Sequence, residues 1–174
     1  MGVLSVLQPT AKAAEALGRV MDPRKVPAAL GGLASSEAAQ LLARENPRMA
    51  IRLIAAWLST REAVWWGALC LAQVRKSNAD IGSAEALRRV VAWVAVPEAP
   101  NAEALAGDAE GLMPAALLAR AVLLTRDNIS PAKGHPVAPK SGMANRMTGG
   151  AILAALARWP ATVSYTHLTL PTKA

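Results

Sequence analysis

The sequence STREAVWWGALCLAQV, residues 59–74, carries the adjacent tryptophans Trp65 and Trp66 directly after a helix-start signal. Its first four residues have the S-x-x-E form of a capping box, in which Ser59 and Glu62 bind each other's backbone amides. Apolar residues then occupy two neighbouring stripes of the predicted helix, which indicates contacts with several other helices. We therefore expect a central helix that ends near residue 75 and around which the rest of the chain packs.

Large apolar residues in and around this helix are predicted to form the core. An indole buries about 150–250 Å², and adjacent side chains of a helix diverge by about 100°, so Trp65 and Trp66 cannot form one ligand-binding platform. Cys70 has apolar neighbours, which favours a small buried hydrophobe over a nucleophile. The residues expected in the core are Trp57, Trp65, Trp66, Leu69, Cys70 and Trp93.

The composition is that of one compact domain. The chain has 174 residues, of which 53% are apolar and 18% charged, so it can bury a core without disulfides or a structural metal. Its single cysteine cannot form an intramolecular disulfide. No apolar run approaches the ~18 residues of a membrane span, and residues 1–10 lack a secretion signal. We therefore expect no transmembrane segment and a cytoplasmic location.

The formal net charge of +7 is compatible with an acidic protein, a nucleic acid or an anionic membrane as partner. The cations are scattered, however, and most stand singly between apolar residues, as at Arg44, Arg52 and Arg75. Long side chains at such positions cover apolar neighbours while their charges stay in water. The chain also has no signature of a nucleic-acid-binding module. Nucleic-acid binding is therefore disfavoured.

Cap, proline and glycine signals divide the chain into further helices, predicted over residues 10–20, 36–45, 47–58, 83–96, 101–109, 115–125 and from 148 onward. We therefore predict an all-α, single-domain bundle of about six to eight short helices. The sequence RVVAWVA at 89–95 echoes RLIAAWLS at 52–59, which leaves open a stack of similar helical hairpins.

Residues 126–147 interrupt this pattern with three prolines and two glycines. A structureless stretch of this length inside a domain is usually functional or disordered. Its basic side chains could contact an acidic partner, although a merely solvated loop is the alternative. The candidate partner-binding residues are Arg126, Lys133, His135, Lys140 and Arg146.

No catalytic, cofactor-binding or metal-ligating constellation occurs in the sequence. His135 cannot form a zinc site without further ligands, and Glu62 already has a structural role in the capping box. We therefore expect no cofactor and favour a protein–protein interaction or accessory module, without a defined oligomeric state. An enzyme whose site is incomplete in this chain and a weak nucleic-acid binder remain the alternatives.

The last residues, 163–174, read VSYTHLTLPTKA and differ in composition from the Ala-, Leu- and Arg-rich chain before them. They resemble the translation of a sequencing-library adapter. We therefore expect a helical domain over residues 1–162, truncated at its C-terminus, followed by a non-native tail.

The run REAVWW at 61–66, followed by Cys70 and by a basic loop and an Ala/Leu-rich helix, resembles a bacterial family of unknown function. That family is known mostly from proteobacteria, and some members are encoded near type VI secretion genes. The resemblance covers most of residues 30–162. It implies a small helical accessory protein of a secretion locus and assigns no functional residue.

Overall fold

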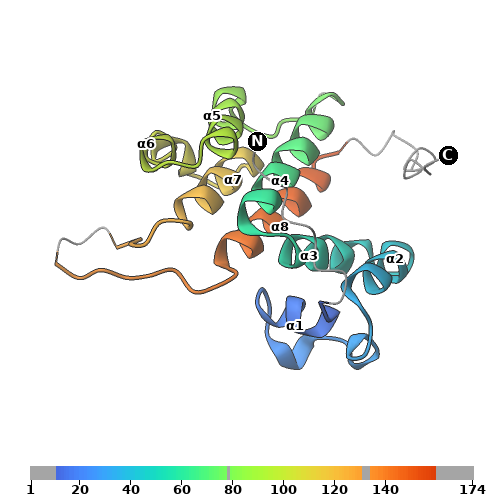
Figure 1. Cartoon of the computed structure of the whole chain (residues 1–174). Helices are drawn as coiled ribbons and strands as arrows, with labels where there is room; N and C mark the ends of the chain where they lie inside the picture. The colour runs from blue at the N-terminus through green and yellow to red at the C-terminus, as the bar shows by residue number, and fades with distance from the viewer. Residues whose placement is uncertain (1–10, 78, 131–133, 160–174) are drawn as a thin grey trace.

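The computed structural model describes residues 11–77, 79–130 and 134–159 (Figure 1). These residues form eight α-helices and three short 3-10 helices without a strand, so the predicted all-α, single-domain fold is confirmed. The α-helices are α1 (Ala13–Gly18), α2 (Ser35–Glu45), α3 (Pro47–Trp57), α4 (Thr60–Arg75), α5 (Ala84–Ala95), α6 (Ala99–Glu103), α7 (Pro114–Leu123) and α8 (Met143–Leu156). The 3-10 helices are η1 (Pro23–Lys25), η2 (Ala28–Leu30) and η3 (Gly107–Ala109).

Two hydrophobic clusters lie side by side in the body of the molecule. One is built from α1, η2, α2 and α3, with Leu17 and Leu53 fully buried in it. The larger one is built from α4 to α8 and includes Leu71 and Leu118. Helix α8 packs against α3, α4 and α7 and lies beside α4 at the centre of the molecule (Figure 1). This helix therefore joins the two clusters.

Three helices begin at the cap residues that the sequence indicates. The side chain of Asn46 accepts a hydrogen bond from the Met49 amide at 3.1 Å and starts α3. At α4 both halves of the capping box are present, and the Ser59 amide donates to the Glu62 carboxylate at 3.0 Å. Ser83 caps α5 in the same way as Asn46 caps α3. Local side-chain acceptors therefore place the ends of the central helices.

Helix α4 turns the face with Gly67 and Leu71, not the one with Trp65, toward the core. Its buried face includes Ala63, Gly67 and Ala68. A Cβ atom added at Gly67 would lie 2.8 Å from a methyl carbon of Leu118 in α7 and 2.9 Å from a methyl carbon of Thr148 in α8. Both neighbouring helices thus cross α4 at a distance that only glycine permits.

The prediction that Trp65 and Leu69 belong to the core is wrong. Their side chains are 45% and 50% exposed, because the close crossing over Gly67 fixes the opposite side of α4 as the buried one. The other predicted core residues lie deeper. Trp93 is 5% exposed, and those half-buried at the edges of the two clusters are Trp57, Trp66 and Cys70.

A buried asparagine fastens α8 to the junction of α3 and α4. Asn145 is 6% exposed, and its amide nitrogen donates to the carbonyl oxygens of Ala55 at 2.7 Å and Leu58 at 2.9 Å. Its side-chain oxygen accepts from the Thr60 hydroxyl at 3.1 Å. The last carbonyls of α3 lack partners within their own helix, so Asn145 supplies partners where the chain turns sharply into α4.

The C-terminal helix begins at Met143, earlier than the predicted start at Thr148, so residues 143–147 are helical and not part of a loop. Gly142 precedes it with a φ of 81°. A Cβ atom at Gly142 would lie 2.5 Å from the carbonyl oxygen of Arg19. The helix therefore starts where a glycine allows the chain to pass close to the end of α1.

Two other predicted helices differ in extent. The first is shorter than the predicted 10–20 and runs over Ala13–Gly18. The region predicted as one helix over 101–109 forms α6 and the separate turn η3. Asn101 lies inside α6 and donates to the Val96 carbonyl at 2.8 Å, so it does not cap a helix. In the part of the chain that the structure describes, no helix is long and apolar enough to span a membrane.

Candidate docking groove

Helices α4 and α5 form an antiparallel hairpin that is closed at one end by an arginine. The guanidinium of Arg61, at the start of α4, donates to the carbonyl oxygens of Val94 at 2.7 Å and Ala95 at 3.1 Å. These carbonyls belong to the end of α5 and have no partner within that helix. Arg61 thus fixes how the two helices lie together.

A groove of about 800 Å³ lies between the C-terminal half of α4 and α5. Two larger apolar side chains, Leu87 and Val91, contribute to it from α5. The remaining lining residues are four alanines and three cations: Ala72, Ala84, Ala92, Ala95, Arg75, Lys76 and Arg88. No lining residue is acidic, so the groove is apolar inside and positively charged at its edges.

Exposed apolar side chains extend this surface along α4. Trp65 and Leu69 are exposed, and their spacing of four and three residues places them on one stripe of the helix with Ala72, which is half-buried and lines the groove. On α5, Val91 is 48% exposed. A single exposed hydrophobe needs no explanation, but a continuous stripe of them next to a groove is typical of an interaction site.

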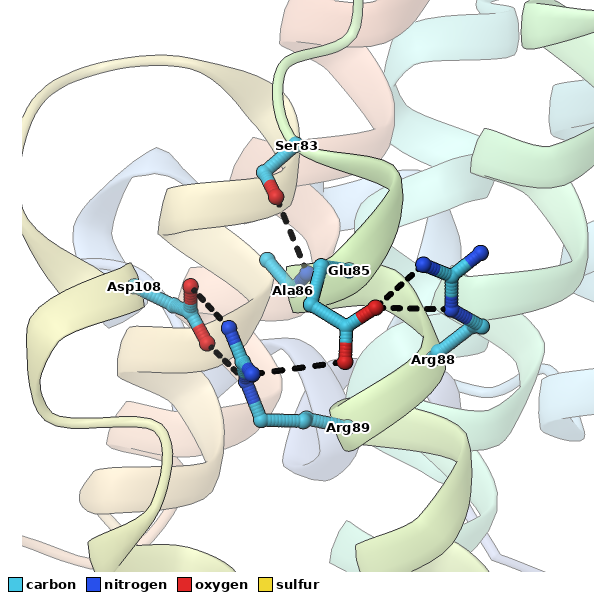
Figure 2. A network of polar contacts seen from close by, with 6 residues as sticks. All are labelled: Ser83, Glu85, Ala86, Arg88, Arg89 and Asp108. Atoms are coloured by element: carbon cyan, nitrogen blue, oxygen red, sulfur yellow. Dashed lines mark hydrogen bonds and ion pairs between the residues drawn. The ribbon is translucent and has the colours of Figure 1, made fainter.

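An ion-pair network holds the basic residues of α5 in place (Figure 2). The Nε atom of Arg88 donates to Glu85 at 2.9 Å. Arg89 binds both carboxylate oxygens of Asp108, at 2.7 and 3.1 Å, and also contacts Glu85 at 3.3 Å. Arg88 lines the groove, whereas Arg89 fastens α5 to η3. Adjacent arginines thus divide into one that faces the groove and one that holds the scaffold.

The pKa values in this network follow from its geometry. The hydrogen bond from Arg88 and its positive charge hold the pKa of the Glu85 carboxyl below its ordinary value. The hydrogen bonds to Asp108 raise the pKa of Arg89. Both groups therefore stay charged at neutral pH, and the ion pairs that join α5 to η3 persist.

The structure does not gather the candidate partner-binding residues of the 126–147 segment. Arg126 forms an ion pair with Glu103 of α6 at 3.4 Å, and Lys133 lies outside the described residues. His135, Lys140 and Arg146 are exposed, and Arg146 lies in α8. Within the described ranges, no hydrogen bond or ion pair connects two of these side chains.

The described parts of this segment form an arm between α7 and α8 that extends away from the helical body (Figure 1). Its two sides are linked because the Asn128 side chain accepts from the amides of Ser130 at 2.9 Å and Val137 at 2.8 Å. The Ile129 amide also donates to the Val137 carbonyl at 2.9 Å. The described residues of the arm present separate cations and one large exposed hydrophobe, Val137, rather than a formed site.

The described residues offer little for catalysis. They contain no group of three His, Cys, Asp or Glu side chains that could hold a metal ion. Burial raises the pKa of the Cys70 thiol to about 11, which leaves a poor nucleophile at neutral pH. A smaller hollow of about 120 Å³ beside Arg19 and Asn145 is polar, but the Asn145 amide is already hydrogen-bonded and Arg19 donates to the Ala56 carbonyl at 2.9 Å.

Sequence reasoning missed the groove because the apolar residues of α4 were all assigned to the core. One signal could have separated the two faces. The stripe that carries Trp65 and Leu69 has a cation at each end, Arg61 and Lys76. The opposite face carries no charge and has the small Ala63 and Gly67 beside Leu71 and Val74. Charges at both ends of a stripe indicate a solvent-facing surface, and small residues indicate a close helix crossing.

The model of a family of unknown function, DUF6931, matches residues 38–169. The match thus includes both groove helices in full and extends into the segment 163–174, of which residues 163–169 are covered. Neither the search of curated proteins nor the search of solved structures found a match.

Proposed function

We propose, from the premise that the chain belongs to the DUF6931 family of unknown function, that it is a protein–protein interaction module whose partner docks in the α4–α5 groove. The observation that carries the proposal is the exposure of Trp65, Leu69 and Val91 on two adjacent helices beside the groove. Exposing these side chains to water is unfavourable, and a partner that covers them gains the free energy of burial.

Other functions have less support from the described residues. An enzyme would need converging titratable groups, and the strongest titratable cluster, around Glu85 and Arg89, is an ion-pair network that joins helices. A nucleic-acid partner would need phosphate contacts spread along a basic surface. The cations at the groove instead surround an apolar floor, which a phosphate backbone would leave uncovered.

We further propose that the partner is encoded close to this chain, in a bacterial locus related to type VI secretion, and that the complex forms in the cytoplasm. The support is the resemblance of the REAVWW segment at 61–66. Neighbouring gene products are therefore the first proteins to test as partners.

The experiment is a co-purification of each neighbouring gene product with the tagged protein. The variant Leu69→Asp/Val91→Asp places charges in the exposed apolar surface of the groove without touching the core. The matched control Leu41→Asp/Val137→Asp changes two apolar residues that are exposed elsewhere, on α2 and on the arm. We expect the groove variant to lose the partner and the control to keep it. If the groove variant keeps the partner and the control variant loses it, the partner binds elsewhere on the protein.

A further inference from the structure

We infer that the α4–α5 groove receives an amphipathic helix of a partner protein, with large apolar side chains along its centre and carboxylates along its edges. The inference rests on the proposed function and specifies the chemistry of the partner. Three properties of the groove lead to it: a floor of small side chains, a length of a few helical turns, and a positively charged edge.

The side chains that line the groove are mostly small. Four of the nine lining residues are alanines, and Leu87 is already buried. Such a floor lets another backbone approach closely but leaves space that a partner must fill. Large side chains such as leucine or phenylalanine, spaced three and four residues apart on one face of a helix, would fill it.

The length of the groove fits a short helix. From Ala84 to Ala95 the lining residues of α5 span almost the whole helix, which corresponds to about 16 Å at 1.5 Å per residue. A helix of three turns covers that distance. On the α4 side, the stripe of Trp65 and Leu69 continues the apolar surface from Ala72 toward Arg61, alongside the second half of α5.

The charges at the edge select the partner. Arg75 and Lys76 lie at the end of α4 and Arg88 lies opposite on α5. Within the described part of the chain, neither Arg75 nor Lys76 takes part in an ion pair, and the pair of Arg88 with Glu85 is exposed to solvent. Exposed pairs of this kind stabilise little, so Arg88 can exchange Glu85 for a carboxylate of the partner. Acidic side chains beside the apolar face would be attracted and basic ones repelled.

An anionic membrane is the other surface with this charge. A membrane would require the apolar residues to protrude together beyond the cations. Here apolar residues such as Leu87 and Ala92 line a hollow between two helices, and lipid would not fill it without leaving the alanine floor uncovered. The shape therefore favours a helix over a bilayer.

The experiment uses three labelled peptides of about 15 residues, long enough for four helical turns, and the full chain. One has a leucine stripe flanked by glutamates, one has the same stripe flanked by lysines, and one has the acidic composition in scrambled order. Fluorescence anisotropy should show binding of the acidic amphipathic peptide and roughly tenfold weaker binding of the other two. Sedimentation with phosphatidylserine vesicles should leave the protein in the supernatant.

Charge variants test which cations of the protein attract the acidic peptide. The substitution Arg75→Glu/Lys76→Glu should lower the affinity for the acidic peptide by roughly tenfold. The neutral version Arg75→Gln/Lys76→Gln should lower this affinity by a few fold. It adds no negative charge at the C-terminal end of α4, where such a charge would be unfavourable. The control Arg44→Glu/Arg48→Glu reverses two exposed cations on α2 and α3 and should leave affinity within about twofold. Melting temperatures of all variants show that they are folded.

Equal or tighter binding of the lysine peptide, capture of the protein by vesicles, or an unchanged affinity after Arg75→Glu/Lys76→Glu would overturn the inference. These results do not decide the proposed function. If Leu69→Asp/Val91→Asp abolishes co-purification of a natural partner while the acidic peptide fails to bind, the groove is a docking site for a partner of different chemistry. If that variant leaves co-purification intact, the proposed function itself fails.

Discussion

Asn145 of α8 and Ala55 of α3, 90 residues apart in the chain, are joined by a hydrogen bond of 2.7 Å from the side-chain amide to the backbone carbonyl. The same amide nitrogen reaches Leu58. One buried side chain therefore replaces the partners that the last turn of α3 loses where the chain enters α4. The side-chain oxygen of Asn145 also accepts from the Thr60 hydroxyl at the start of α4, so this residue ties α8 to both helices at the turn.

Replacing this asparagine should destabilise the fold strongly. Asn145→Ala leaves two backbone carbonyls without their protein partner, and each buried unsatisfied group costs about 1–3 kcal/mol. We expect a loss of about 2–4 kcal/mol in the free energy of unfolding, measured by urea denaturation. The control Asn101→Ala removes a single hydrogen bond, to the Val96 carbonyl, and should cost less than about 1 kcal/mol. Similar losses for both variants would show that the Asn145 contacts carry no special weight.

Two glycines test the close crossing of α4. Gly67→Ala places a methyl group within 3 Å of Leu118 and Thr148, and overpacking of this kind costs about 1–3 kcal/mol. Gly150 lies in α8 with open space where its Cβ would be, so Gly150→Ala should stabilise by about 0.5–1 kcal/mol through helix propensity. Thermal unfolding should therefore shift in opposite directions. A neutral Gly67→Ala would mean that α7 and α8 pack more loosely against α4.

The tryptophans should differ in their effect on stability. Trp93 is buried, and its replacement by alanine should cost about 3–5 kcal/mol. Trp65 is half-exposed at the surface, so Trp65→Ala should cost about 1 kcal/mol or less while weakening the partner complex. Denaturant unfolding of both variants makes the comparison. If Trp65→Ala lowers the free energy of unfolding as much as Trp93→Ala does, Trp65 is a core residue.

The thiol of Cys70 should lose its proton at a higher pH than an ordinary cysteine thiol. Burial raises its pKa in the folded protein to about 11, so the neutral thiol is the favoured form in the native state. The contribution of the buried neutral thiol to the free energy of unfolding is fully present below the pKa that Cys70 has in the unfolded chain. It is lost as the pH rises through about 11. The rate of reaction with a disulfide reagent, measured against pH, should give this raised pKa in buffer and an ordinary one in urea. Rapid labelling at neutral pH in buffer would contradict the burial of Cys70.

Local signals in the sequence were sufficient to place most helix starts. Asn46, Ser59 and Ser83 act through neighbours within three residues, so their effect can be inferred without knowledge of the fold. The start of α8 could not be inferred in this way. It depends on the approach of Gly142 to Arg19, more than a hundred residues earlier in the chain, and on the contacts of Asn145 with the end of α3.

The orientation of α4 shows the same limit. Hydrophobicity alone favoured burial of Trp65 and Leu69, because large apolar residues gain most from leaving water. The fold instead buries the face with Gly67, Leu71 and Val74, and at Gly67 the side chains of Leu118 in α7 and Thr148 in α8 approach α4 closely. The groove therefore arises from a tertiary choice between two apolar faces, and the sequence pattern permits either one.

Site-specific photo-crosslinking tests most directly whether the groove binds a partner. A photoreactive amino acid is introduced at Leu69, beside the groove, or at Leu41, an exposed leucine on α2, in the full chain expressed together with its genomic neighbours. We predict a discrete crosslinked product from Leu69, mapped by mass spectrometry to one helical segment of the partner, and none from Leu41. A product from Leu41 in the absence of one from Leu69 would contradict a docking site between α4 and α5.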